Sequence, residues 1–189
     1  FRPIKILGPR LDTLSSHASK RVGVFFSGGV DSFYTLLKHK NEITDLIYIH
    51  GYDIDLRDEV RHRSVSEMCA KVADRLGKNL VTLETNARRV LKGYGKWGPH
   101  QFGLALGSVA QTLSPHFSKI YISSGFDEEN LRPWGSHPRT NPLLGNSAIN
   151  IVHYGAQAKR TEKIKTLSNY AIAMEHLRVC YENVSNTYN

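Results

Sequence analysis

A cluster of residues suited to binding a phosphate follows the first apolar run of the chain, Val22–Phe26. Small and hydroxyl-bearing residues come directly after this run and lead into a helical pattern; they are Ser27, Gly28, Gly29, Val30, Asp31 and Ser32. Where a strand turns into a helix in this way, successive backbone N–H groups and the helix N-terminus converge on one point and attract an anion. The sequence therefore predicts an anion site at residues 27–32.

Each residue type in this segment has a use at a phosphate site. Gly28 and Gly29 let the backbone approach a phosphate because no Cβ intervenes, and the hydroxyls of Ser27 and Ser32 can donate to its oxygens. Asp31 would repel a phosphate, so we expect it to hold Mg²⁺ or to accept hydrogen bonds from loop amides. The alternative is a plain capped turn. Neither a Walker loop nor a Gly-x-Gly-x-x-Gly fingerprint occurs here.

The segment matches, position for position, the Ser-Gly-Gly-x-Asp-Ser signature of the PP-loop ATP pyrophosphatases, and the chain resembles that family. The resemblance implies an α/β, Rossmann-like (HUP) fold with a five-stranded parallel sheet in the order 3-2-1-4-5 and helices on both faces. It also implies an AMP-forming ligase, which binds ATP and Mg²⁺, adenylates a carbonyl or carboxylate substrate and releases pyrophosphate. Ammonia or a sulfur donor then reacts with the activated carbon. Formation of a C–N bond is favoured; a thiolase or tRNA-modifying enzyme and a noncatalytic ATP-binding module remain alternatives.

The resemblance also carries further site residues. In a sheet of this order, ligands bind where the chain reverses, between strands 1 and 4. The resemblance implies that His50 and Gly51, at the end of strand 2, lie near the adenine. Gly125 and Phe126, after strand 4, would lie beside the phosphate loop.

Within the family, the order of features is most similar to that of the 7-cyano-7-deazaguanine synthase group. An acidic and aromatic-Pro stretch follows strand 4, at residues 125–134, and Arg160-Thr161-Glu162 opens a later helix. Arg160 would stabilise charge on the departing pyrophosphate; the alternative is a surface arginine at a helix start. That group also carries a zinc site of four cysteines. Cys180 matches the first of them, and the other three would lie in a chain that continues beyond Asn189; the alternative is a protein without zinc, in which Cys180 is a buried packing residue.

A long segment, residues 125–150, is expected to form the substrate loop, because long loops in compact domains usually carry function. Its candidate substrate residues are Asp127, Trp134, His137 and Arg139. An aromatic ring, an imidazole and a cation so close in sequence can stack on or hydrogen-bond a planar heterocycle. An ordered surface loop without such a role is the alternative.

The elements that must position these residues alternate between short β-rich runs and helical patterns, which predicts parallel strands joined by crossover helices. Expected strands are 22–26, 45–49, 80–84, 119–123 and 149–153, and expected helices are 32–40, 58–76, 99–114 and 161–168. The second helix is expected to bury a stripe that includes Val60, Val65 and Val72. Residues 86–98 are expected to form a loop. The whole chain, 1–189, is predicted to be one nucleotide-binding domain, with residues 1–20 an irregular extension.

Composition limits the partners and the compartment. The formal charge is +8, but the basic residues are dispersed, so a small-molecule substrate is favoured over tRNA, which stays open. The two cysteines cannot form a disulfide framework, and no apolar run is long enough to cross a membrane. We expect a cytoplasmic protein; a homodimer remains open. Cys69 is expected to pack in the core, although a thiolase would require a reactive cysteine.

Overall fold

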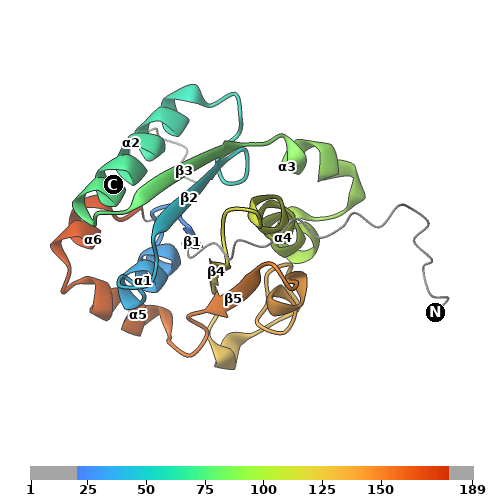
Figure 1. The fold of residues 1–189 in the computed structure, drawn as a ribbon. Helices are drawn as coiled ribbons and strands as arrows, with labels where there is room; N and C mark the ends of the chain where they lie inside the picture. The colour runs from blue at the N-terminus through green and yellow to red at the C-terminus, as the bar shows by residue number, and fades with distance from the viewer. Residues whose placement is uncertain (1–20, 179–189) are drawn as a thin grey trace.

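The computed structural model describes residues 21–178 as an α/β fold built on a five-stranded, all-parallel sheet (Figure 1). The strand order is β3-β2-β1-β4-β5, as predicted. The strands are β1 (Val22–Phe25), β2 (Asp45–His50), β3 (Asn79–Glu84), β4 (Lys119–Ser123) and β5 (Asn150–Tyr154). The central strand β1 pairs with β2 through Val24↔Leu46 and with β4 through Val24↔Tyr121.

Helices cover both faces of the sheet (Figure 1). One face is packed against α1 (Val30–Lys38), α2 (Glu59–Arg75), α5 (Arg160–Leu167) and α6 (Ala171–His176). The other face is covered by α4 (Phe102–Leu113). The short helix α3 (Ala87–Val90) follows β3 and continues into a 3₁₀ turn, Leu91–Tyr94.

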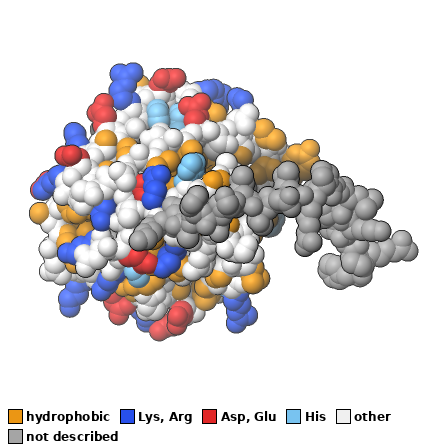
Figure 2. Space-filling view, viewed as in Figure 1, with side chains coloured by type: hydrophobic (Ala, Val, Ile, Leu, Met, Phe, Trp, Pro, Cys, Tyr) orange, Lys and Arg blue, Asp and Glu red, His pale blue; other side chains and the backbone are white. Residues whose placement is uncertain are grey.

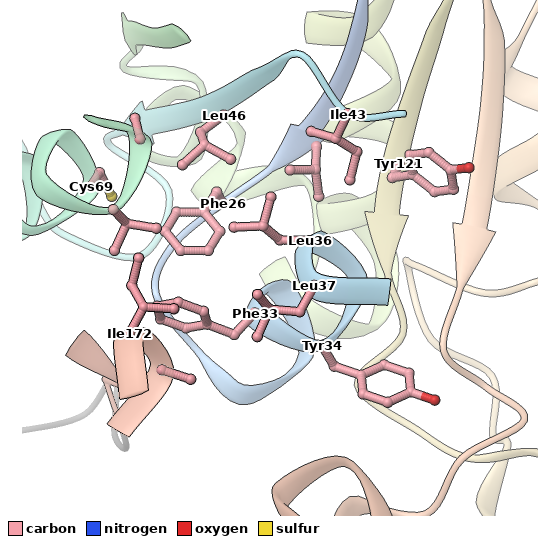
Figure 3. Packing of buried hydrophobic residues seen from close by; sticks show 14 of the residues in the cluster. Phe26, Phe33, Tyr34, Leu36, Leu37, Ile43, Leu46, Cys69, Tyr121 and Ile172 are labelled. Atoms are coloured by element: carbon pink, nitrogen blue, oxygen red, sulfur yellow. The ribbon is translucent and has the colours of Figure 1, made fainter. Parts of the chain in front are cut away.

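The alternation of side chains along each strand divides the core into two clusters. In β1 and β2, Val24 and Leu46 point to the side of α1 and α2, whereas Phe25 and Ile47 point to the side of α4. Figure 3 shows the first cluster, in which Phe26 packs edge-on against Phe33 of α1 with ring centroids 4.9 Å apart. Because β1 and β2 are buried on both faces along their whole length, their sequences are nearly continuous apolar runs.

Each predicted strand and helix is present, and the differences have local causes. Helix α1 begins at Val30, two residues before the predicted start, because Gly29 is its N-cap. In α2, Val60 is 73% exposed rather than part of the buried stripe, which consists of Val65, Cys69, Val72 and Ala73. The predicted loop at 86–98 contains α3, and the sequence analysis missed α6.

Two predictions fall outside the described residues: the irregular extension at 1–20 and the zinc ligand Cys180. Within residues 21–178, no helix is long and apolar enough to span a bilayer. Lys and Arg side chains lie scattered around the rim of the face seen in Figure 2, several of them beside Asp or Glu.

Candidate active site

A cavity of about 230 Å³ opens at the carboxyl ends of β1, β2 and β4, where the strand order reverses. Crevices at this position are where open α/β sheets bind ligands. The predicted residues on its wall are Ser27, Gly29, Asp31, Ser32, Gly125, Phe126 and Trp134. Residues outside the predicted set include Tyr52, Asp53, Phe102, Leu106 and Ser136. The fold therefore brings four of the six candidates at 27–32 and part of the predicted substrate loop to one cavity, whereas Gly28 and Val30 do not line it.

The structure explains the presence of glycine at positions 28 and 29 in different ways. Gly28 has a φ of +77°, and a Cβ built on it would lie 2.2 Å from Cε of Met68 on α2. Gly29 has an ordinary φ of −75°, and its Cβ would meet one neighbour within 4 Å, the Ser27 Oγ at 3.7 Å. The fold itself thus requires glycine at 28 but not at 29. Gly29 lines the cavity, so its missing side chain leaves room for a ligand.

The donors at this loop are the first-turn N–H groups of α1 and the serine hydroxyls. The N–H groups at the start of an α-helix have no intrahelical acceptor, and Val30, Asp31 and Ser32 form that first turn. Ser32 is buried, and its hydroxyl donates to the Gly29 carbonyl at 3.0 Å. Ser32 therefore braces the loop here, and donation to a phosphate would require its hydroxyl to rotate. Ser27 lies on the cavity wall.

Asp31 is held by two cations from α5. The Lys163 Nζ lies 2.9 Å from Asp31 Oδ1, and the Arg160 Nη1 lies 3.3 Å from Asp31 Oδ2. Lys163 is only 2% exposed and donates a second hydrogen bond, of 2.7 Å, to the Ser124 carbonyl at the end of β4. A buried ammonium needs such partners, since desolvation without them would be costly. One lysine of α5 thus contacts both the loop at 27–32 and the end of β4.

Arg160 is among the candidates predicted from the sequence, whereas Lys163 is not. The available signal was the spacing of three residues, which places both side chains on one face of a helix. Arg160 is 56% exposed, pairs with Asp31 and does not itself line the cavity. Both carboxylate oxygens of Asp31 are occupied by cations, so Mg²⁺ would have to share or displace them. In the described part of the chain no cluster of three or more metal-ligating side chains exists, so Mg²⁺ would take its other ligands from phosphates and water.

Aromatic side chains form the far wall of the cavity. The rings of Phe126 and Trp134 meet edge-on with centroids 5.7 Å apart, and the Arg132 guanidinium lies 4.4 Å from the Phe126 centroid. Trp134 is locked against Gly98, where a Cβ would lie 2.4 Å from its ring. The Gly135 N–H donates to the Gly98 carbonyl at 3.0 Å. This part of the substrate loop is therefore fixed against the segment before α4.

A chain of buried polar groups stands behind Ser136. Asn141 is fully buried, and its Nδ2 donates to Ser136 Oγ and to His153 Nδ1, each at 2.8 Å. Burial lowers the pKa of His153 to about 4, with help from the charges of His137 and Lys163. The imidazole is therefore neutral and accepts from Asn141. Because Ser136 Oγ already accepts from Asn141, its own hydrogen is left to donate, and Ser136 lines the cavity.

Only some of the residues at the end of β2 line the cavity. Tyr52 and Asp53 line the cavity, but His50 and Gly51 do not. His50 is buried, with its ring stacked 3.8 Å from that of His62 and its Nδ1 3.3 Å from Glu84 Oε2. The structure therefore places His50 among neighbouring side chains rather than on the predicted ligand surface.

Arg178 also contacts the loop at 27–32, and it is not among the residues predicted from the sequence. Its N–H donates to the Gly28 carbonyl at 2.8 Å, and its Nη1 lies 3.4 Å from the Ser27 carbonyl and 3.8 Å from Asp53 Oδ2. The side chain is buried, yet Nε and Nη2 have no hydrogen-bond partner among residues 21–178. No local pattern in the sequence marks this arginine, because it reaches the loop from the far end of the fold.

Three predicted substrate residues lie off the cavity wall. Asp127 caps the 3₁₀ turn Glu128–Asn130 and accepts from the Asn130 N–H at 3.2 Å. The His137 Nδ1 accepts from the Arg139 N–H at 3.1 Å, so these two residues shape the loop. Arg139 is exposed. Of the four predicted substrate residues, Trp134 alone reaches the cavity.

No protein-family model matches this chain, and no curated protein is significantly similar to it in sequence. The site is therefore interpreted from its own geometry.

Proposed function

We propose that this protein is an ATP-dependent adenylating enzyme that activates a small carbonyl or carboxylate substrate for C–N bond formation. The observation that carries the proposal is the loop at 27–32, which leads into the first turn of α1 and contributes Ser27, Gly29, Asp31 and Ser32 to the same cavity as Phe126 and Trp134. An anion-binding end and an aromatic end in one cavity fit a nucleotide and a planar substrate side by side.

In the proposed first step, a substrate oxygen attacks the α-phosphorus of ATP. A P–O bond to the substrate forms, the bond between the α-phosphorus and the bridging oxygen breaks, and pyrophosphate leaves with that electron pair. Ammonia then attacks the activated carbon, and AMP departs with the former substrate oxygen. The released proton passes to solvent.

The protein's part in this chemistry is positioning and charge stabilisation. The N–H groups at the start of α1 and the Ser27 hydroxyl would hold phosphate oxygens, and Ser136 would donate to the substrate. Mg²⁺ bound to the phosphates would offset charge on pyrophosphate. Arg160 and Lys163 add positive charge at Asp31, on one side of the loop.

The described residues support thiolase activity less well than C–N bond formation. Such an enzyme needs a thiolate that can carry sulfur. Burial raises the pKa of the Cys69 thiol to about 12, and the side chain is fully buried in the first core cluster. Cys69 is therefore a packing residue, and a sulfur-carrying role would fall to Cys180, outside the described residues.

The test is product analysis after incubation with ATP, Mg²⁺, ammonia and a panel of planar heterocyclic carboxylates. We expect AMP and pyrophosphate in equal amounts, and their loss in the Asp31→Asn variant. The matched control is Asp74→Asn, an exposed aspartate on α2 away from the cavity, which should keep full activity.

The other outcomes distinguish the rival functions. ADP and phosphate as products would indicate a phosphotransferase. Tight ATP binding without turnover would indicate a noncatalytic module. A requirement for sulfide in place of ammonia would restore the thiolase reading. Any of these results would overturn the proposed function.

A further inference from the structure

A second concavity, of about 630 Å³, lies beside the cavity at the exits of β2 and β3. We call it the basic groove and define it by Arg57, Arg61, Arg88, Arg89, Lys92 and Trp97. Asp53 lines both the basic groove and the cavity, so the two concavities adjoin. Neither the phosphate loop nor the aromatic wall of the cavity uses these cations.

The positive charge of the basic groove is unevenly compensated. Three carboxylates share its wall: Asp53, Asp55 and Asp58. Arg57 pairs with Asp55, with Nε 2.9 Å from Oδ1, and Arg61 pairs with Asp58 at 3.2 Å. Arg89 and Lys92, which also line the groove, are exposed, and their side chains make no hydrogen bond or ion pair with other residues of the described range, although the charge of Arg89 helps to lower the pKa of Asp55.

The sequence of that wall explains the surplus. Residues 85–118 contain four Lys or Arg residues and no Asp or Glu: Arg88, Arg89, Lys92 and Lys96. A stretch of 34 residues without a carboxylate cannot neutralise its own cations. The dispersed charge of the whole chain is therefore locally concentrated where α3 and its 3₁₀ turn border the basic groove.

Flat side chains are interleaved with these cations. The Trp97 ring lies on the groove wall with the Arg88 guanidinium 5.5 Å from its centroid, and Tyr94 is 84% exposed on the 3₁₀ turn. Hydrophobic side chains gather at the end of the molecule that carries α3 (Figure 2). The Tyr52 and Trp97 rings meet with centroids 5.0 Å apart, so one ring of this pair faces the cavity and the other faces the groove.

We propose that the basic groove, which adjoins the cavity at Asp53, binds the sugar-phosphate backbone of a single-stranded polynucleotide. Unpaired cations along a groove contact successive phosphates, and exposed aromatic faces stack on unpaired bases. A duplex hides its base faces in the stack, so it could use the cations but not Trp97 or Tyr94. The proposal goes beyond the adenylation chemistry, because strand binding requires neither ATP nor turnover.

The test measures binding of labelled single strands of about 12 nucleotides, a length within the range of single-strand binding sites. RNA and DNA strands are compared by fluorescence anisotropy without ATP, across roughly 50–200 mM salt. The groove variant is Arg89→Gln/Lys92→Gln. The matched control is Lys71→Gln/Lys165→Gln, which removes two exposed cations that line neither concavity.

We expect the groove variant to bind a single strand at least about tenfold more weakly than the native protein. The slope of log affinity against log salt concentration is negative, and its magnitude should decrease by about 1.4 in the groove variant. Each phosphate contact on a single strand contributes about 0.7, and the variant loses two. The control variant should keep the native slope. The preferred strand, RNA or DNA, identifies the source of the polynucleotide.

Three results would overturn the proposal. The first is no binding of either strand at the lowest salt. The second is an equal loss in the groove and control variants, which would assign binding to net charge alone. The third is competition by a mononucleotide at the same phosphate concentration as the strand, which would reduce the groove to a single-phosphate site. Because ATP is absent, each result is independent of whether the chain adenylates a substrate.

Discussion

Lys163 and Asp31 form an ion pair of 2.9 Å between Nζ and Oδ1, although 132 positions separate them in the chain. The pair joins the start of α5 to the start of α1, and the ammonium also holds the Ser124 carbonyl at the end of β4. Three segments that border the cavity therefore depend on one buried cation.

The first prediction concerns the stability of this pair. Lys163→Met should destabilise the fold by about 2–3 kcal/mol, less than the ~3–5 kcal/mol of a fully buried pair, since Asp31 keeps 21% of its side-chain surface exposed and Arg160 remains beside it. Urea unfolding measures the change. Adding Asp31→Asn should recover part of the loss, because the unpaired carboxylate is removed; strictly additive effects would contradict the coupling.

Substitution of the two loop glycines should affect different quantities: stability at Gly28 and ATP affinity at Gly29. Gly28→Ala should cost at least about 1–2 kcal/mol of stability, because φ is positive and Met68 occupies the space. Gly29→Ala should leave the free energy of unfolding within about 1 kcal/mol of the native value, since its backbone suits alanine. ATP binding to Gly29→Ala should weaken at least about tenfold, or about 1.4 kcal/mol. Thermal unfolding and calorimetric titration measure both; unchanged ATP affinity would argue against a phosphate beside Gly29.

Replacing Ser136 should change the KM for the substrate and leave the KM for ATP unchanged. Ser136→Ala removes the donor that lines the cavity and leaves one Asn141 hydrogen unpaired, at a cost of about 1 kcal/mol. We expect the substrate KM to rise and the ATP KM to stay the same. Thr112→Val on α4 is the control, because that exposed hydroxyl donates to the Ser108 carbonyl of the same helix and lines neither concavity. Equal changes in both KM values would rule out a specific substrate contact.

His153 should make stability depend on pH. Its pKa is lowered from 6.5 to about 4 in the folded protein, so the unfolded chain binds the proton more readily. The free energy of unfolding should therefore fall as pH decreases from about 6.5 to about 4, by up to about 3 kcal/mol from this group. Comparing native protein with His153→Gln isolates the effect from His39 and His62, whose pKa values burial also lowers. Identical pH profiles would contradict the prediction.

Cys69 should resist alkylation in the native protein. Because its thiol is buried and its pKa is about 12, iodoacetamide should modify it only when the core opens. Peptide-resolved mass spectrometry across a urea series should show modification that follows global unfolding. Rapid labelling without denaturant would show that the thiol is accessible and would revive its candidacy as a sulfur carrier.

The strands and most helices could be predicted because their signals are local. The β character of a run such as Lys119–Ser123 is visible in consecutive residues. The turn into α1 is likewise marked by six consecutive residues, 27–32. The strand order came from the resemblance to a family. By contrast, α6 is a helix of six residues, too short for a periodic signal to emerge.

The lining of the cavity could be predicted where suitable residues are consecutive in the chain, as for Ser27, Gly29, Asp31 and Ser32. It could not be predicted where distant segments meet. Arg178 reaches the loop from the end of α6, and Ser136 is oriented by Asn141 and His153. His137 had suitable chemistry, but its imidazole accepts a hydrogen bond from the Arg139 N–H within its own loop. Residue type alone could not reveal which loop side chains turn inward.

The seam between β1 and β4 has a consequence for how the molecule assembles. Strands β1, β2 and β3 pair in sequence order, as do β4 and β5, but the pairing of Val24 with Tyr121 closes a long loop between the two groups. Non-local pairings of this kind are slow to form. The cavity has walls from both sides of the seam, Tyr48 on one and Ile122 on the other. A ligand in the cavity would therefore bridge the two groups of strands and slow their separation during unfolding.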